Sequence, residues 1–446
     1  MARQHLRKAI VSAAIALAAA TSSEVGAAAE TALKLEKGDH VAIVGNTLAD
    51  RMQHSGYFES LIYKANPQSD LTVRDLGFSA DEINVRPRSE DFGSPDDWLK
   101  RTQADVVLGF FGFNESFNGP EGIPQFKMDL DKYITDLKKD DFSGRGAVRF
   151  VLFSPIAQEK LADPNFPDPT KNNSGIKLYS AAMAEVAKEH GVLFVDLYTP
   201  SEELYKDSKS PLTIDGLHLN DAGYKALAPI MYKAVFGVDA PAMDDSFEKI
   251  RQAVLEKNSM WFSRYRTVDG YNVYGGRSHM AYESPKGGPK ITNRQVMQEE
   301  MTDRDVMTAN RDQRVWAVSK GGDLQVQDEN LPPVTPVKTN DPGTNPDKSW
   351  VYPSGEEQIK HMTVPRNVKV NLWASEEQFP ELINPVQMAW DTKGRLWVSA
   401  WRNYPERTPT DKTGDSILIF EDTKGTGHAD KCTHFIDGLN LSLIHI

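Results

Sequence analysis

Two residues three positions apart, Asp215 and His218 in Asp-Gly-Leu-His, form a potential acid–base pair. Histidine titrates near neutral pH and can take a proton from a hydroxyl, while a carboxylate orients the ring and stabilises its charged form. Thr47 supplies a hydroxyl, and Asn114 supplies an amide that can meet developing negative charge. Residue types of this kind can transfer a proton and stabilise negative charge. Taken singly, Asp-x-x-His is also common in surface turns and helix caps, and Asn114 is also a natural cap for a following helix.

The elements that must position these residues alternate along the first half of the chain. Five short apolar runs predict strands, and four amphipathic stretches between and after them predict helices. The predicted strands are 41–44, 71–76, 105–111, 148–153 and 192–195, and the predicted helices are 48–65, 126–139, 176–190 and 221–236. This order predicts a three-layer α/β/α fold around a doubly wound, parallel, five-stranded sheet.

Four polar segments lie where such a sheet places its ligands, just beyond the carboxyl ends of strands. They are 45–48, 77–81, 112–115 and 215–220. Within them we interpret Ser79 as a turn residue, with a hydrogen-bonding role in the site as the alternative. We interpret Glu115 and Asp81 as solvated or capping residues.

In this order, the four segments resemble the four sequence blocks of the SGNH (GDSL-type) hydrolase superfamily, over residues 37–237. The resemblance implies a serine nucleophile after the first strand, a glycine amide and an asparagine as oxyanion donors, and an Asp-x-x-His pair. By position, His218 matches the general base, Asp215 its partner and Asn114 the oxyanion asparagine.

Three positions depart from that pattern. Thr47 stands in place of the serine, Asn46 in place of the usual aspartate, and Ala80 in place of the oxyanion glycine. Threonine keeps a hydroxyl but adds a methyl group and restricts χ1. Ala80 keeps its N–H and can donate it if its φ is negative.

Two functions therefore remain open from the sequence. The first is an esterase, acting on small-molecule or glycan acyl esters, with Thr47 as nucleophile. The second is a module that binds such a ligand without turning it over; a structural spacer is a weaker third reading.

Composition limits the partners and cofactors. The chain has 446 residues and a net charge of −12, which disfavours binding to nucleic acid. Its single cysteine, Cys432, excludes an intramolecular disulfide and a site built of cysteines for zinc. We expect no cofactor or metal site, and the oligomeric state stays open.

The N-terminal residues 1–29 are typical of a signal peptide. Arg3, Arg7 and Lys8 precede a short apolar run, and three alanines end at position 29. We expect an exported protein, periplasmic or extracellular, with no stable membrane span after cleavage. An uncleaved anchor helix is the alternative.

The second half of the chain differs in character. We interpret 238–327 as a helical and irregular extension, and 328–363 as a linker rich in Pro, Asn and Asp. Residues 364–446 predict an incomplete all-β unit with strands at 368–372, 396–400 and 416–420.

That β unit resembles the opening of a β-propeller found in large, exported, haem-binding and sugar-dehydrogenase-like proteins of planctomycete type. The haem motif C-x-x-C-H is absent, so the sequence indicates no haem or quinone chemistry. We expect the natural protein to continue, because residues 441–446 look like a translated sequencing adaptor; a genuine short C-terminus is the alternative.

Overall fold

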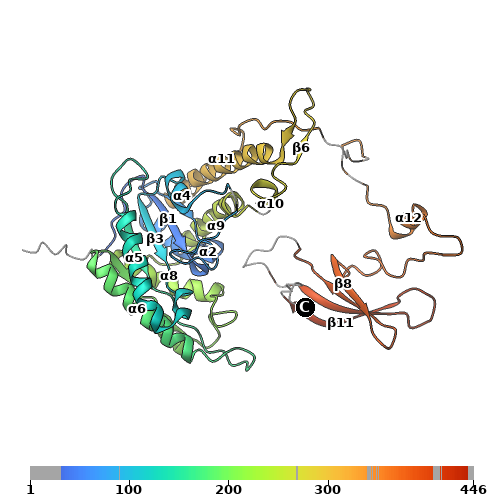
Figure 1. The fold of residues 1–446 in the computed structure, drawn as a ribbon, viewed down its shortest axis with the longest axis horizontal. Coiled ribbons are helices and arrows are strands. Elements are labelled where there is room, and N and C mark those ends of the chain that lie inside the picture. Colours follow the sequence, from blue (N-terminus) through green and yellow to red (C-terminus); the bar gives the residue numbers. More distant parts are fainter. Residues whose placement is uncertain are drawn as a thin grey trace, which may run out of the picture. The chain divides into compact units, whose positions relative to one another are not determined.

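The five predicted strands form one parallel sheet in the computed structural model (Figure 1). Residues 32–439 are described, apart from 90, 268–269, 339–342, 344, 348, 350, 405–411 and 413. The predicted signal peptide and residues 441–446 lie outside this range. The strands are β1 (His40–Gly45), β2 (Thr72–Asp75), β3 (Val106–Phe110), β4 (Arg149–Phe153) and β5 (Leu193–Val195). Their spatial order is β2-β1-β3-β4-β5.

Helices flank this sheet on both faces, as the alternating pattern predicts (Figure 1). They are α2 (Thr47–Ser55), α3 (Tyr57–Ala65), α4 (Pro95–Arg101), α5 (Ile123–Leu137), α6 (Thr170–Glu189), α7 (Tyr198–Asp207) and α8 (Asp221–Phe236). Two short 3₁₀ turns, η1 (Glu115–Asn118) and η2 (Pro120–Gly122), precede α5. The predicted α/β/α fold class is confirmed.

The sheet owes its stability to apolar side chains on both faces. Every residue of β3 is buried, and so are five of the six residues of β1. Continuous burial explains why these strands appear as unbroken apolar runs in the sequence. Because all five strands are parallel, their carboxyl ends share one edge, and that edge carries the polar segments.

One helix prediction was wrong in its extent. The stretch 48–65 is not a single helix but the pair α2 and α3, separated at Gly56. Gly56 has φ of 70°, a left-handed conformation that ends one helix and redirects the chain into the next.

The chain divides into two compact units. The first comprises residues up to 50, 61–86 and 95–243, and the second comprises 51–60, 87–94 and 244–446. In the second unit, α9 (Asp245–Tyr265) packs against α11 (Asn293–Ser319). The buried Lys257 ammonium lies 2.6 Å from the Glu59 carboxylate there. Because the pair is buried, removing either side chain would leave an uncompensated charge in the interior and destabilise the protein.

The remaining described elements of the second unit are short, apart from one antiparallel sheet. The short elements are α10 (Gly270–Val273), β6 (Ala281–Tyr282), β7 (Ile291–Thr292) and α12 (Gly355–Lys360). The sheet has the order β11-β10-β9-β8, from β8 (Pro385–Trp390), β9 (Leu396–Ala400), β10 (Asp415–Glu421) and β11 (Lys431–Leu439).

Two of the three strands predicted in this region are present, as β9 and β10. The third, 368–372, is wrong: these residues have no strand conformation. The adjoining Trp373 carbonyl accepts one hydrogen bond from the Ala429 amide instead of forming a ladder. Among the described residues, no helix combines the length and apolar character that crossing a bilayer requires.

Candidate active site

The turn from β1 into α2 brings the Thr47 hydroxyl to the carboxyl edge of the sheet. Gly45 has φ of 126°, and a Cβ there would collide with the Phe110 carbonyl of the neighbouring strand. Only glycine fits this close approach. Asn46 follows, and its side-chain oxygen accepts the Leu48 amide at 3.2 Å. Thr47 is therefore the first residue of the helix, where free amides favour negative charge.

Asp215 and His218 form a hydrogen-bonded pair in the loop before α8. The distance from His218 Nδ1 to Asp215 Oδ2 is 2.6 Å. The other carboxylate oxygen accepts the backbone amides of Leu217 and His218 at 2.9 and 2.8 Å. If Nδ1–H donates to the carboxylate, the lone pair of Nε2 is left to act as a base.

Electrostatics keep this carboxylate ionised. Partial burial acts to raise the pKa of Asp215, but the hydrogen bonds from the His218 side chain and from the two amides outweigh it. The pKa of Asp215 therefore lies well below its usual range. A negative charge on Asp215 stabilises the imidazolium that forms when His218 accepts a proton.

Of the two predicted oxyanion donors, Ala80 contacts Thr47 and Asn114 contacts Ala80. The Ala80 amide donates to Thr47 Oγ1 at 3.4 Å, and Asn114 Nδ2 donates to the Ala80 carbonyl at 2.9 Å. Ala80, however, has φ of 69°. The condition of a negative φ is therefore not met, and the Ala80 amide points toward Thr47 from a conformation that alanine adopts at a cost.

A cavity joins the hydroxyl and the base. Thr47 and His218 both line it. Apolar side chains form most of the remaining wall: Leu48, Phe113, Pro155, Ile156, Leu217 and Leu219. Within the described residues, the Thr47 hydroxyl makes no hydrogen bond to His218; its bond is with the Ala80 amide.

A buried glutamate that the sequence reasoning missed supports the loop of the acid–base pair. Glu159 accepts the Thr213 amide at 2.8 Å, the Thr213 hydroxyl at 2.5 Å and the Leu212 amide at 3.1 Å. Thr213 Oγ1 in turn accepts the Gly216 amide at 3.0 Å. No local signal identifies Glu159, because its partners lie more than fifty positions away in sequence.

Glu115 and Asp81 were predicted to be solvated or capping residues; both are buried, which contradicts the solvated alternative. Glu115 accepts the Ile83 amide at 3.0 Å and the Gly112 amide at 2.9 Å, which ties together the segments that follow β2 and β3. Burial raises the pKa of Glu115 to about 7. Ser79 donates to Asp50 at 2.5 Å and stabilises the turn after β2.

Comparison with protein families now identifies the class of domain. Residues 44–226 match the model of the GDSL-like lipase/acylhydrolase family, and residues 354–443 match that of a domain of unknown function, DUF7133. The first match runs from the end of β1 into the first turns of α8 and includes all five predicted site residues. The chain therefore carries a GDSL-like lipase/acylhydrolase domain, followed by a DUF7133 region.

Several solved structures are similar to part of the chain. A gut microbial diltiazem-metabolizing enzyme is 22% identical with a TM-score of 0.36, covering 46% of this chain; the chain spans 48% of that enzyme. A catalytic mutant of the acetylxylan esterase Axe2 from Geobacillus stearothermophilus is 17% identical with a TM-score of 0.35, covering 45% of this chain and 96% of its own. The alpha/beta hydrolase LAE5, from the metagenome of Lake Arreo in Spain, is 19% identical with a TM-score of 0.34, at the same coverages. None of the curated proteins compared with the chain matches it.

Proposed function

We propose that the first domain hydrolyses ester bonds with Thr47 as its nucleophile. One observation carries this proposal: Thr47 and His218 line the same cavity, and Asp215 holds the ring of His218 at 2.6 Å. The family match of residues 44–226 supports the same reaction class.

In the proposed reaction, His218 Nε2 takes the proton of the Thr47 hydroxyl as the oxygen attacks the ester carbonyl. The amides of Thr47 and Ala80, with the Asn114 side chain, stabilise the resulting oxyanion. The tetrahedral intermediate collapses to an acyl-threonine, and His218 returns its proton to the leaving alcohol. Water, deprotonated by His218, then releases the acid and restores Thr47.

A second candidate function is a binding module with the same pocket and no turnover. The observation that favours it is the hydrogen bond from Ala80 to the Thr47 hydroxyl, with none from Thr47 to His218. The added methyl group of threonine also crowds the carbonyl that must approach.

Hydrolysis of p-nitrophenyl acetate by the full chain separates these candidates. We expect measurable turnover in the wild type and a gain of at least about tenfold for Thr47→Ser, equivalent to roughly 1.4 kcal/mol in barrier, because serine keeps the hydroxyl and relieves crowding. Thr47→Ala and His218→Ala should both fall to background, because nucleophile and base act as a unit.

Two results contradict the proposal. If Thr47→Ser is folded but inactive, the pocket binds without catalysing. If Thr47→Ala keeps the wild-type rate, Thr47 is not the nucleophile.

We further propose that the C-terminal sheet begins a β-propeller, and that the substrate is a small-molecule or glycan acyl ester. We also propose that the protein is exported and meets this substrate outside the cytoplasm. Support for export comes from residues 1–29 of the sequence. N-terminal sequencing of the mature protein should start near Glu30, and a start at Met1 contradicts export.

A further inference from the structure

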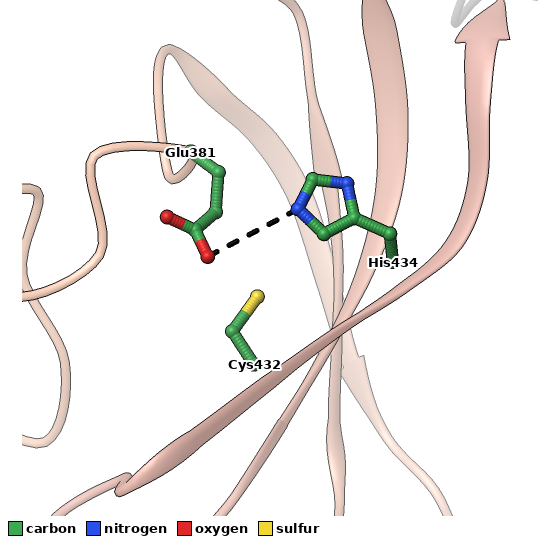
Figure 2. Close-up of side chains that lie close together, drawn as sticks. All are labelled: Glu381, Cys432 and His434. Atoms are coloured by element: carbon green, nitrogen blue, oxygen red, sulfur yellow. Dashed lines mark ion pairs between the residues drawn. The ribbon is translucent and has the colours of Figure 1, made fainter.

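Three side chains of the C-terminal sheet region converge outside the candidate active site. Figure 2 shows Glu381, Cys432 and His434 pointing toward one another, with Cys432 and His434 on one strand and Glu381 on a loop. One donor atom from each lies within 4.8 Å of the others, and His434 Nε2 is 4.0 Å from Glu381 Oε1. Their charges and donor atoms suit a cation rather than an anion.

Strand geometry produces this convergence. Cys432 and His434 pair with Phe420 and Leu418 of β10, and because they are two positions apart they share one face of the sheet. That face carries the apolar cluster against which Cys432 packs. The Cys432 side of the site therefore borders a hydrophobic core.

A bulge adds a second carboxylate behind the histidine. The register shifts between Ile417 and Leu418, so that Phe435 is an extra residue on β11. The alternation of side chains changes there, and Asp437 returns to the face of His434. Its carboxylate lies 2.7 Å from His434 Nδ1.

This contact directs the other nitrogen of His434 toward the cluster. When Nδ1–H donates to Asp437, the lone pair of Nε2 faces Glu381 and Cys432. A carboxylate behind a histidine is the usual arrangement at zinc sites, because it fixes the tautomer and strengthens the ligand.

We propose that Glu381, Cys432 and His434 bind Zn²⁺, with Asp437 as the positioning residue of His434. A thiolate, an imidazole and a carboxylate are the three donors that zinc accepts together, and a fourth position stays open to water or a ligand. A single cysteine excludes a site made of cysteines, but one thiolate shared with histidine and carboxylate is a different donor set.

Distances are compatible with this assignment. Zinc bonds of about 2.0–2.3 Å place tetrahedral donor atoms about 3.5 Å apart, so shifts of about 1 Å in these side chains close the site. Glu381 and His434 retain 29% and 45% of their side-chain exposure, which leaves a path for the ion and freedom to move.

Binding of Zn²⁺ to the sulfur of Cys432 releases the thiol proton to solvent.

Thiol labelling offers a direct test, because Cys432 is the only cysteine of the chain. The full chain is stripped with a chelator and labelled with Ellman's reagent, with and without added zinc chloride. We expect zinc to slow labelling at least about tenfold, because a bound thiolate is shielded from the reagent. His434→Ala and Glu381→Gln should both abolish this protection, while the matched control His361→Ala, at an exposed histidine outside the cluster, should keep it.

A second measurement tests the role of Asp437. Competition with a chromophoric zinc chelator should show affinity reduced about tenfold or more in Asp437→Asn. Unchanged affinity refutes the positioning role.

An unchanged labelling rate in the wild type with zinc, or protection that survives in either ligand variant, overturns the three-ligand site. Urea unfolding without metal should show that all variants are folded.

Discussion

Ala80 carries backbone strain at the point where the candidate site needs an amide donor. Its φ of 69° belongs to the left-handed region, which costs alanine about 1–2 kcal/mol relative to the right-handed region. The Asn114 side chain, bonded to the Ala80 carbonyl, helps to hold the conformation. Strain kept in this way indicates that the direction of the Ala80 amide matters for the pocket.

We predict that Ala80→Gly stabilises the protein by about 1 kcal/mol, because glycine adopts a positive φ without steric cost. The matched control is Ala181→Gly, at an exposed position inside α6, which should destabilise by about 1 kcal/mol. Urea unfolding of both variants measures the difference. Equal destabilisation by both substitutions would show that Ala80 is not strained.

At the scale of elements, the loop from Leu212 to Gly216 is held by Glu159 in addition to one isolated antiparallel bridge between Thr213 and Leu219. The backbone amides of Leu212 and Thr213 both donate hydrogen bonds to the buried Glu159 carboxylate. The Thr213 hydroxyl in turn accepts a hydrogen bond from the Gly216 amide. Removing the acceptor leaves buried donors unsatisfied, at about 1–3 kcal/mol each.

We predict that Glu159→Ala speeds amide hydrogen exchange at Leu212, Thr213 and Gly216 by at least about tenfold, because their acceptors are lost or displaced. Ester hydrolysis, where measurable, should fall mainly in kcat, since Glu159 does not line the cavity. Thr213→Ser keeps the hydroxyl and should preserve both properties. Unchanged exchange in Glu159→Ala contradicts the supporting role.

Glu115 links the loops after β2 and β3 and predicts a pH dependence of stability. Its pKa is raised from 4.5 to about 7, mainly by burial, so the folded state favours the protonated form. The stability from this group is fully present below about pH 4.5 and is lost as pH rises through about 7.

Urea unfolding between about pH 5 and about pH 8 should therefore show falling stability in the wild type, by up to the order of 3 kcal/mol, and a flatter profile in Glu115→Gln. Glu189→Gln, at an exposed position of α6, is the control and should keep the wild-type slope. Parallel profiles for wild type and Glu115→Gln would show that another group governs this range.

At the scale of the whole molecule, a long segment with little regular structure follows α11 and precedes the residues that match DUF7133. Between the end of α11 at Ser319 and the start of α12 at Gly355, the described residues contain no helix or strand, and most of them are exposed. Backbone of this kind is the preferred site of proteolytic cleavage.

We predict that limited trypsin digestion cuts this segment first and leaves the α/β domain intact. The C-terminal sheet should be degraded next, because every residue of β8 is exposed and large apolar side chains such as Met388 and Trp390 lie at its surface. Mass spectrometry of the fragments measures the order. Equal resistance of both regions contradicts this prediction.

The sequence by itself determined the α/β fold and located the candidate site segments. Buried parallel strands require unbroken apolar runs, and ligand-binding loops follow the carboxyl ends of such strands. The strand at 106–110 and the other strands of its sheet can therefore be predicted from the sequence. Asp215 and His218 were predictable for a related reason: their contact is local, three residues apart.

Tertiary structure alone decided the features that depend on distant partners. The positive φ of Ala80, the burial of Glu115 and the bonds of Glu159 to a loop fifty residues away leave no local pattern in the sequence. The cluster around Cys432 is of the same kind, because a bulge in β11 places Asp437 behind His434. Periodicity records which face of an element is buried, whereas long-range hydrogen bonds depend on where the chain returns in space.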